Sequence, residues 1–301
     1  MIRADTVSGM PADLTVLFCT DPLTPGRVDA HFAAQAATVR DLGGTVALID
    51  HDALLAGDAP LSVRKVPRDA GPVWYRGWMI PSASYDDLSQ ALTDRGAPLH
   101  VTPDRYRTAH ELPGWYATFE AVTPQSVWTP WKPGEEPSQA QIAEWLAPLG
   151  SGPAIVKDYV KSRKHEWAEA CFIPDATDIE HATTVIARMI ELQEDTLQGG
   201  VVLRRFENYE QADGRTVEAR VWWVDGEPAL VSAHPDTPER APEPDLTAIV
   251  LLVRKLGCRF ITTDVARRDD GVWRVVEVGD GQVSDLPAGA DARVLFSALG
   301  R

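Results

Sequence analysis

The chain has 301 residues, of which 44% are apolar and 24% are charged, an ordinary composition for a globular protein. This length exceeds what one hydrophobic core usually serves, so we expect two or three packed subdomains and exclude a fibrous or disordered chain. The count of 29 Lys+Arg against 44 Asp+Glu gives a net charge of −15, which disfavours nucleic acid and anionic membranes as partners.

Targeting signals and disulfides are not expected either. Cys19, Cys171 and Cys258 lie far apart and without CxxC spacing, which predicts reduced thiols in the core. Residues 1–14 lack a basic segment followed by an apolar run, and no stretch of about 18 apolar residues occurs. We therefore predict a cytoplasmic protein with neither a signal peptide nor a membrane span.

The beginning of the chain has the pattern of a βαβ unit. Apolar runs and helical spacing predict a strand at 13–19, a helix at 28–42, a strand at 45–49, a strand at 73–75, a helix at 84–92 and a short strand at 99–101. Strand, helix and strand at this spacing indicate a parallel sheet, so this region is expected to be a small doubly wound domain.

The rest of the chain alternates helices and hairpins. Residues 110–136 are rich in Pro and Trp and are interpreted as a connecting segment. The elements predicted after it are a helix at 138–146, a strand at 154–157, a helix at 178–197, a strand at 201–206, a hairpin at 216–233, a helix at 246–256 and a hairpin at 258–279. The fold class is therefore mixed α/β.

The last hairpin carries two opposed carboxylates. A two-residue turn at Asp270-Gly271 would place Asp264 directly opposite Glu277, with β-carbons about 4.5–5.5 Å apart. Two carboxylates that close repel each other unless a proton or a cation intervenes, and oxygen ligands favour Mg²⁺ or Mn²⁺. A third carboxylate, Asp280, lies in the following turn. The alternative is a solvent-facing pair of acids, with nearby arginines that weaken the repulsion between them.

Basic residues gather in two other places. Lys157 ends a predicted strand and is followed by Lys161, Ser162, Arg163, Lys164 and His165, a local positive island that could hold ATP phosphates or be a solvated turn. Strand alternation predicts that Arg204 and Arg205 point to opposite faces. It also places Arg220 on the same face as Glu218, which could form a structural ion pair with a buried arginine.

These elements, in this order, resemble the ATP-grasp superfamily, and most closely its clade named for two arginines and a lysine. The strings that carry the resemblance are Tyr75-Arg-Gly-Trp78, Ile155-Val-Lys-Asp-Tyr-Val-Lys-Ser162, Val202-Leu-Arg-Arg-Phe206, Glu218-Ala-Arg220 and Glu277-Val-Gly-Asp-Gly-Gln-Val-Ser284. The resemblance implies a βαβ domain at residues 1–110 and a two-lobed domain with antiparallel sheets at residues 111–301. The central lobe would span about 137–200 and the C-terminal lobe about 201–301.

The resemblance also implies a role for each matching residue. Lys157 would bind the α/β phosphates, and Lys161 and Ser162 would lie in a loop over the triphosphate. The strand with Leu203, Arg205 and Phe206 would lie beside adenine. Arg220, together with Arg204 or Arg205, would face the γ-phosphate or the acyl phosphate. Asp264, Glu277 and Asp280 would bind Mg²⁺ or Mn²⁺. Asp280 would substitute for the Asn that the familiar ligases have at the place of Gly279.

The implied activity is an ATP-dependent carboxylate–amine ligase that forms an amide through an acyl phosphate. Its substrates would be small-molecule or peptide carboxylates and amines. The alternatives are a phosphotransferase, a ligase that modifies a protein or RNA, and a nucleotide-binding module without catalysis. The identity of the acid and the amine stays open, as does the oligomeric state, a homodimer included.

Overall fold

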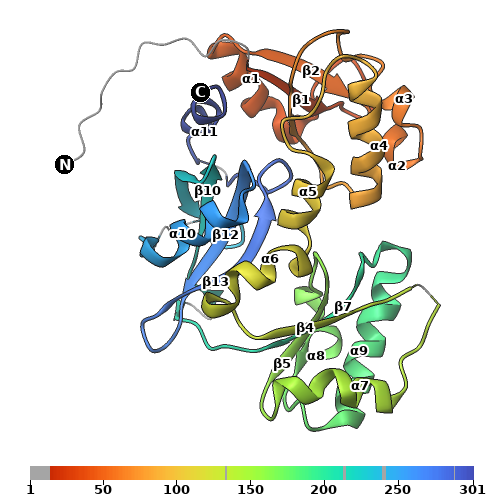
Figure 1. The fold of residues 1–301 in the computed structure, drawn as a ribbon, viewed down its shortest axis with the longest axis vertical. Helices are drawn as coiled ribbons and strands as arrows, with labels where there is room; N and C mark the ends of the chain where they lie inside the picture. Colours follow the sequence, from red (N-terminus) through yellow and green to blue (C-terminus); the bar gives the residue numbers. More distant parts are fainter. Residues whose placement is uncertain (1–13, 133, 213–214, 239–241, 288) are drawn as a thin grey trace.

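A computed structural model describes residues 14–132, 134–212, 215–238, 242–287 and 289–301. In these ranges the chain forms three sheets of three or four strands and one two-stranded ribbon. The three sheets follow one another along the longest axis of the molecule, with the N-terminal sheet at one end (Figure 1). The mixed α/β fold class predicted from the sequence is confirmed.

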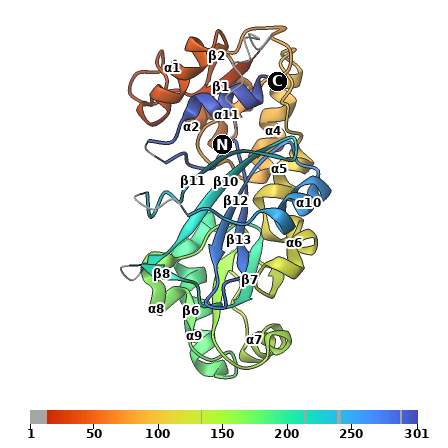
Figure 2. The same cartoon turned by 90° about the vertical axis from the view of Figure 1, so that its left-hand side faces the viewer.

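The N-terminal sheet is parallel and has the strand order β2-β1-β3. Its elements are β1 (Thr15–Cys19), α1 (Ala33–Asp41), β2 (Thr45–Ile49), α2 (His51–Leu55), α3 (Ala59–Ser62), β3 (Trp74–Arg76), α4 (Ser82–Thr93) and α5 (Pro103–His110). The strand expected at 99–101 is reduced to a single bridge between Val73 and Leu99. The helix from the far end of the chain, α11 (Ala292–Leu299), packs on α1 and adds Leu295 and Phe296 to this core (Figure 2).

The middle sheet is antiparallel, with the strand order β11-β10-β12-β13. Its elements are β10 (Glu218–Val224), β11 (Glu227–Ala233), α10 (Thr247–Leu256), β12 (Phe260–Arg267) and β13 (Trp273–Asp280). Adjacent tryptophans on β10 point to opposite faces, as strand alternation predicts. Trp222 joins the core of the N-terminal sheet, whereas Trp223 packs with α10 and α6 (Leu112–Phe119). The sheet therefore shares one core with the N-terminal domain.

The third sheet is also antiparallel, in the order β4-β7-β5-β6, and its core includes residues of α7 and α9. Its elements are β4 (Ser126–Pro130), α7 (Gln139–Leu146), β5 (Ala154–Asp158), α8 (Trp167–Ala170), β6 (Phe172–Ile173), α9 (Ile179–Gln193) and β7 (Gly200–Arg205). Ser138 caps α7 with a capping box, and Asp178 caps α9. We call this unit the central lobe and the β10–β13 unit the C-terminal lobe.

The remaining elements are short. The ribbon consists of β8 (Gln211–Ala212) and β9 (Arg215–Thr216). The 3-10 turns lie at Ala30–Phe32, Glu120–Val122, Ala147–Leu149, Lys164–Glu166 and Glu194–Thr196. In the described ranges no helix is both long and apolar enough to cross a membrane. The three cysteines are free and buried, as predicted.

The interpretation of residues 110–136 as a connection is wrong. The segment contains α6 and β4, and β4 pairs with β7 over its whole length. Leu112, Trp115, Tyr116 and Phe119 recur at helical spacing and are buried, so they form one apolar face. The prolines fit this arrangement, since Pro113 lies in the first turn of α6 and Pro130 ends an edge strand.

The β12–β13 hairpin reaches the predicted pairing of Asp264 with Glu277 by a different route. Arg267 pairs with Trp273, so the loop between the two strands is longer than the two residues expected. Gly271 lies in this loop with a φ of 84°. The longer loop shifts the register by one residue near the turn. A bulge at Val276 then shifts it back, so that Asp264 lies opposite Glu277.

Candidate functional site

A row of charged side chains crosses the C-terminal lobe. Register places Arg220 of β10 opposite Asp264 of β12, and Asp264 opposite Glu277 of β13. Adjacent strands lie about 4.8 Å apart, so three neighbouring positions bring these groups into one line. Arg220 binds Asp264 through two contacts, Nε to Oδ1 at 2.8 Å and Nη2 to Oδ2 at 2.8 Å. Glu218, the other partner considered for an arginine, lies instead 3.9 Å from His234.

The central lobe adds Lys157 to this row. Lys157 lies on β5, is buried, and donates from Nζ to Glu277 Oε1 at 2.8 Å and to the Val160 carbonyl at 3.2 Å. Residues 120 positions apart thus meet across the two lobes. We call Lys157, Arg220, Asp264 and Glu277 the charged quartet.

Both acids of the quartet are ionised. Burial opposes the charge on Asp264, but Arg220 outweighs it and holds the pKa of Asp264 well below its usual range. Burial likewise opposes ionisation of Glu277, and Lys157 reverses the effect, so that the pKa of Glu277 is also lowered. Each carboxylate therefore keeps its charge at neutral pH.

A cavity of about 620 Å³ opens between the two lobes. No member of the quartet lines it, but His234 on its wall lies 3.2 Å from Arg220. The central-lobe wall of the cavity includes Trp167 and Phe206, whose rings lie 5.9 Å apart. The lining residues are Pro124, Ile155, Lys164, His165, Trp167, Arg204, Arg205, Phe206, Glu207, Tyr209, Arg215, Thr216, Glu218, His234, Asp236, Thr237 and Val276. Aromatic rings and charged side chains in one cavity suit a ligand with a flat ring and an anionic tail.

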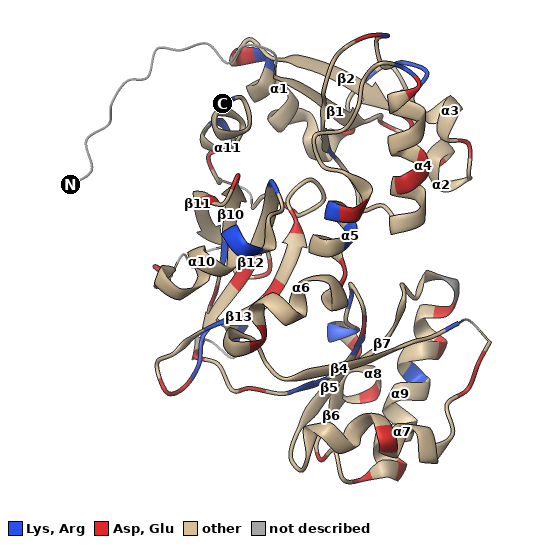
Figure 3. Ribbon diagram, in the orientation of Figure 1, with Lys and Arg blue, Asp and Glu red and all other residues tan. Residues whose placement is uncertain are grey.

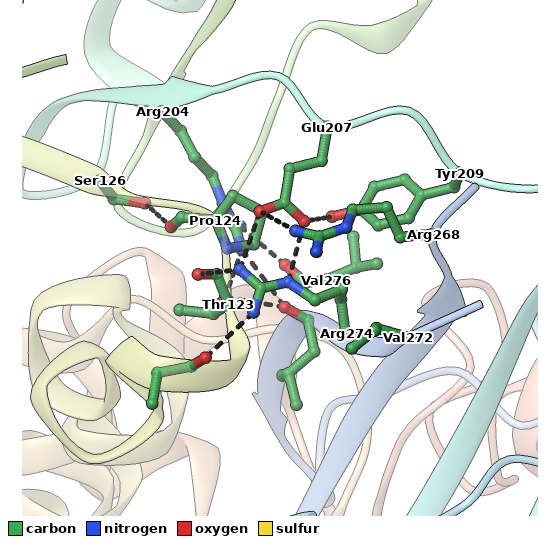
Figure 4. Close-up of polar contacts among 12 residues, drawn as sticks. Thr123, Pro124, Ser126, Arg204, Glu207, Tyr209, Arg268, Val272, Arg274 and Val276 are labelled. Atoms are coloured by element: carbon green, nitrogen blue, oxygen red, sulfur yellow. Dashed lines mark hydrogen bonds and ion pairs between the residues drawn. The ribbon is translucent and has the colours of Figure 1, made fainter. Parts of the chain in front are cut away.

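A polar network joins the segments that cross between the two lobes, and several of its residues line the cavity (Figure 4). Glu207, just after β7, accepts two bonds from Arg274 of β13, at 2.9 and 2.8 Å. Arg274 also donates to the Thr123 carbonyl, just before β4. Arg204 donates to Thr123 Oγ1 and to the Val276 carbonyl at the bulge. We call this set the hinge network, since it joins both segments that cross between the lobes, before β4 and after β7, to β13.

The turn after β5 directs residues other than Lys161 and Ser162 to the cavity. Asp158 accepts hydrogen bonds from the backbone of Val160 and Lys161, which folds the chain into a tight turn directly after β5. Lys161 is exposed, and neither it nor Ser162 is among the residues that line the cavity. The turn instead carries Lys164, His165 and Trp167 to the cavity wall.

The strand expected beside adenine reaches the cavity only at its end. β7 pairs with β4 on one side and β5 on the other, so its backbone is used by the sheet. Leu203 packs in the core of the central lobe. Arg205 and Phe206 both line the cavity, and the guanidinium of Arg205 donates to the Leu149 and Ser151 carbonyls. Arg204 and Arg205 point to opposite faces, as predicted, and Arg204 is the buried one.

Asp280 lies away from the quartet. Side chains alternate along a strand, and Asp280 is three positions from Glu277, so it faces the other side of β13. It is buried there, with Oδ1 accepting from Gln282 at 2.9 and 3.0 Å. Burial raises the pKa of Asp280 to about 7. The alternation of strand residues thus separates it from the two acids that it was expected to join.

Two site residues were missed from the sequence. Lys164 lines the cavity, and although desolvation lowers its pKa, Glu218, Glu277, Asp236 and Asp264 together raise it. The basic island pointed to this segment but not to this position. His234, just beyond β11, accepts the Asp236 backbone N–H at Nδ1, and its Nε2 lies 3.2 Å from Arg220 Nη2 and 3.4 Å from Asp264 Oδ2. No pattern in the sequence indicates this contact.

The donor set fits a magnesium ion that comes with phosphate ligands. No group of three His, Cys, Asp or Glu side chains among the described residues is arranged to hold a metal. Mg²⁺ usually takes one or two carboxylates and completes its shell with water and substrate phosphates. Asp264 and Glu277 are such a pair. The chemistry of the site therefore suits Mg²⁺ bound together with a nucleotide rather than alone.

A family model of the ATP-grasp domain matches residues 148–299 and describes family 3 of the clade named for two arginines and a lysine. These residues include every member of the charged quartet. Acidic and basic positions also occur in the N-terminal region outside this match (Figure 3). No curated protein was found to match the chain.

Solved structures resemble the fold over almost the whole chain. The crystal structure of D-cycloserine synthetase DcsG has a TM-score of 0.62 at 16% identity, covering 95% of this chain and 98% of that one. A RimK domain ATP-grasp protein from Sphaerobacter thermophilus DSM 20745 has a TM-score of 0.56 at 13% identity, covering 95% and 99%. The ATP-grasp ligase PsnB with a minimal precursor has 0.56 at 14%, covering 96% and 99%.

Proposed function

The chain belongs to the ATP-grasp domain family, in family 3 of the clade named for two arginines and a lysine, and on this premise we propose that it is an ATP-dependent carboxylate–amine ligase. The observation that carries the proposal is the cavity between the lobes, which has aromatic groups on one wall and the charged quartet beside it. This arrangement matches the two halves of a nucleotide, a flat base and a polyphosphate chain.

In this proposal the base lies against Trp167 and Phe206 at the end of β7. The backbone that reads its edge belongs to Glu207, because β7 is paired on both sides and the Phe206 N–H and the Asn208 carbonyl are already bonded. Lys164 approaches the phosphates from the lobe that holds the base, and Lys157 approaches them from β5. Several cations on one polyphosphate chain neutralise charge that would otherwise oppose binding and transfer.

The metal would be held by Asp264 and Glu277. When bound, Mg²⁺ supplies charge neutralisation at the phosphate oxygens, which is the main requirement of phosphoryl transfer. Arg220 would then turn from Asp264 to the transferring phosphoryl group. His234, whose ring is oriented by the Asp236 N–H at Nδ1, has Nε2 close to both Arg220 and Asp264 and would help to position them.

The reaction needs no side-chain nucleophile. A carboxylate oxygen of the substrate attacks the γ-phosphorus, ADP leaves, and an acyl phosphate forms. The amine then attacks the acyl carbon, loses a proton and displaces inorganic phosphate. Catalysis is positioning plus electrostatic stabilisation, which buried arginines and lysines provide. The substrate class that we favour is a small molecule or a peptide, because PsnB is a ligase crystallised with a precursor peptide and DcsG is a synthetase named for a small molecule.

Nucleotide binding tests the proposal directly. Isothermal titration of wild type with the non-hydrolysable analogue AMPPNP and Mg²⁺ should give saturable binding at one site. Lys157→Met should weaken it by about tenfold or more, since one charge-assisted contact contributes about 1.5–3 kcal/mol.

Lys255→Met is the matched control, because Lys255 is exposed on α10. Its affinity should equal that of wild type, and thermal unfolding should show that both variants are folded. A folded wild type that binds neither AMPPNP nor ADP would refute the proposed function.

A further inference from the structure

Each acid of the charged quartet is already paired with a cation. Glu277 binds Lys157 at 2.8 Å, and Asp264 binds Arg220 through two contacts of 2.8 Å. The cations are those that the proposed function assigns to phosphate, and the acids are those that it assigns to the metal. Before any ligand binds, each charge of the quartet is therefore compensated by another charge of the quartet.

Three of the four side chains are well shielded from water, and Glu277 is partly exposed. The exposed fractions of the side chains are 5% for Lys157, 7% for Asp264 and 12% for Arg220, while Glu277 is 35% exposed. Removing one partner of a buried ion pair leaves an uncompensated charge in a poorly solvated place, which is strongly unfavourable. Neither pair opens readily unless both partners receive new counter-charges.

A nucleotide without metal cannot satisfy this condition. Its phosphates can attract Lys157 and Arg220, but Glu277 and Asp264 then stay behind, unpaired and facing the same phosphates. Glu218 and Asp236 add negative charge nearby, as their effect on the pKa of Lys164 shows. A metal without nucleotide has the opposite defect, because it attracts the acids and leaves both cations unpaired.

A nucleotide that carries its metal can open both pairs at once. The phosphates take Lys157 and Arg220, while the cation takes Glu277 and Asp264, so that every charge keeps a partner. We propose that Glu277 and Asp264 are specificity-determining residues that make the site select metal-loaded nucleotide and reject metal-free nucleotide. This inference rests on the proposed function and deepens it.

The first experiment measures the coupling between metal and nucleotide in wild type. ADP is titrated calorimetrically into the full chain, once with EDTA and once with saturating Mg²⁺. Binding should be roughly five- to 150-fold tighter with Mg²⁺, the usual range of a coupling between two ligands. By linkage, ADP must raise the affinity for Mg²⁺ by the same factor.

The decisive variant is Glu277→Gln, which removes the charge that holds Lys157 and keeps the shape of the side chain. Metal-free ADP should bind about fivefold tighter than to wild type, and ADP with Mg²⁺ should bind more weakly. Asp264→Asn should change both affinities in the same two directions through Arg220. Opposite signs in the two conditions distinguish this role from a structural one, because a damaged site would bind both forms more weakly.

Glu218→Gln is the matched control. It makes the same change of charge at a residue that lines the cavity, and its ion-pair partner in the structure is His234 at 3.9 Å rather than Lys157 or Arg220. Less repulsion should tighten the binding of metal-free ADP and of ADP with Mg²⁺ by a similar factor. The ratio of the two affinities should therefore equal that of wild type.

The outcomes separate the two proposals. If wild type binds ADP equally well with and without Mg²⁺, or if neither Glu277→Gln nor Asp264→Asn tightens metal-free binding, the inference is overturned while the proposed function stands. If wild type binds no ADP in either condition, both are overturned. Thermal unfolding of each variant shows whether a loss of binding comes from unfolding, and two independent variants protect the test against one of them failing to fold.

Discussion

Asp280 is a buried carboxylate whose Oδ2 atom has no hydrogen-bond partner among the described residues. The Arg76 guanidinium, itself buried between the rings of Phe32 and Trp222, is the cation that lowers the pKa of Asp280, but burial dominates and raises that pKa from 3.8 to about 7. Such a group is protonated in the folded chain at pH values where the unfolded chain has already released its proton.

The raised pKa of Asp280 makes stability depend on pH. Between pH 4 and 7 the folded chain binds more protons at this position than the unfolded chain does, so the free energy of unfolding falls as pH rises. We expect the free energy of unfolding of Asp280→Asn, relative to that of wild type, to increase by about 1.4 kcal/mol per pH unit between pH 5 and 7. Urea unfolding at several pH values measures this difference. A constant offset between the two proteins would show that the pKa is not raised.

At the scale of elements, the β12–β13 hairpin shows how a correct contact can follow from a partly incorrect element. The sequence motif Asp270-Gly271 predicted a two-residue loop, and local patterns do not reveal that the loop is longer. They do not reveal the bulge at Val276 either. The two differences cancel, so the pairing of Asp264 with Glu277 holds although the path to it differs.

Gly271 is the residue that lets this longer loop close. Its φ of 84° is strained for any residue with a β-carbon, although no atom lies within 4 Å of the place where that carbon would be. Gly271→Ala should therefore destabilise the chain by about 1–2 kcal/mol through backbone strain alone. Affinity for ADP with Mg²⁺ should stay unchanged, because the bulge fixes the register at the site.

Gly26→Ala provides the control for this prediction. Gly26 also has open space around its α-carbon, and its φ does not fall in the left-handed region. Alanine there should leave stability unchanged or raise it by about 0.4–1 kcal/mol. Equal effects of the two substitutions in chemical unfolding would contradict the strain argument.

At the scale of the whole molecule, Gln282 joins the N-terminal domain to the C-terminal lobe. Its side chain is fully buried, accepts from the Tyr75 backbone N–H at 3.2 Å, and donates to Tyr85 at 2.9 Å. Its carbonyl accepts from the Gly77 N–H and from Arg76. The cavity between the lobes lies on the other side of the C-terminal lobe, against the central lobe.

Gln282→Ala should therefore lower stability without lowering nucleotide affinity. Truncation leaves the Tyr75 N–H without a partner in a buried place, at a cost of about 1–3 kcal/mol, and removes one of the two hydrogen bonds to Asp280 Oδ1. The midpoint of urea unfolding should fall, while calorimetry at a temperature where the variant is folded should give the affinity of wild type for ADP with Mg²⁺. Gln90→Ala, at an exposed position on α4, should alter neither quantity.

The sequence predicted those parts of the fold that depend on local pattern. Periodicity and turn residues predict the parallel strands, the helices near 28–42 and 178–197, both hairpins and the pairing of Asp264 with Glu277. What it could not predict depends on distant contacts. Lys157 meets Glu277 only when two lobes close on each other, and His234 reaches Asp264 only because β11 lies beside β10.

The position of α11 has a consequence for how the protein emerges from the ribosome. This helix supplies Leu295, Phe296 and Leu299 to the core around β1, although almost the whole chain separates the two elements in sequence. The N-terminal domain is the first to be synthesised and the last to complete its packing. Until residues 292–299 have been translated, the apolar surface beneath α11 stays uncovered, so a chain halted late in synthesis would expose it to chaperones.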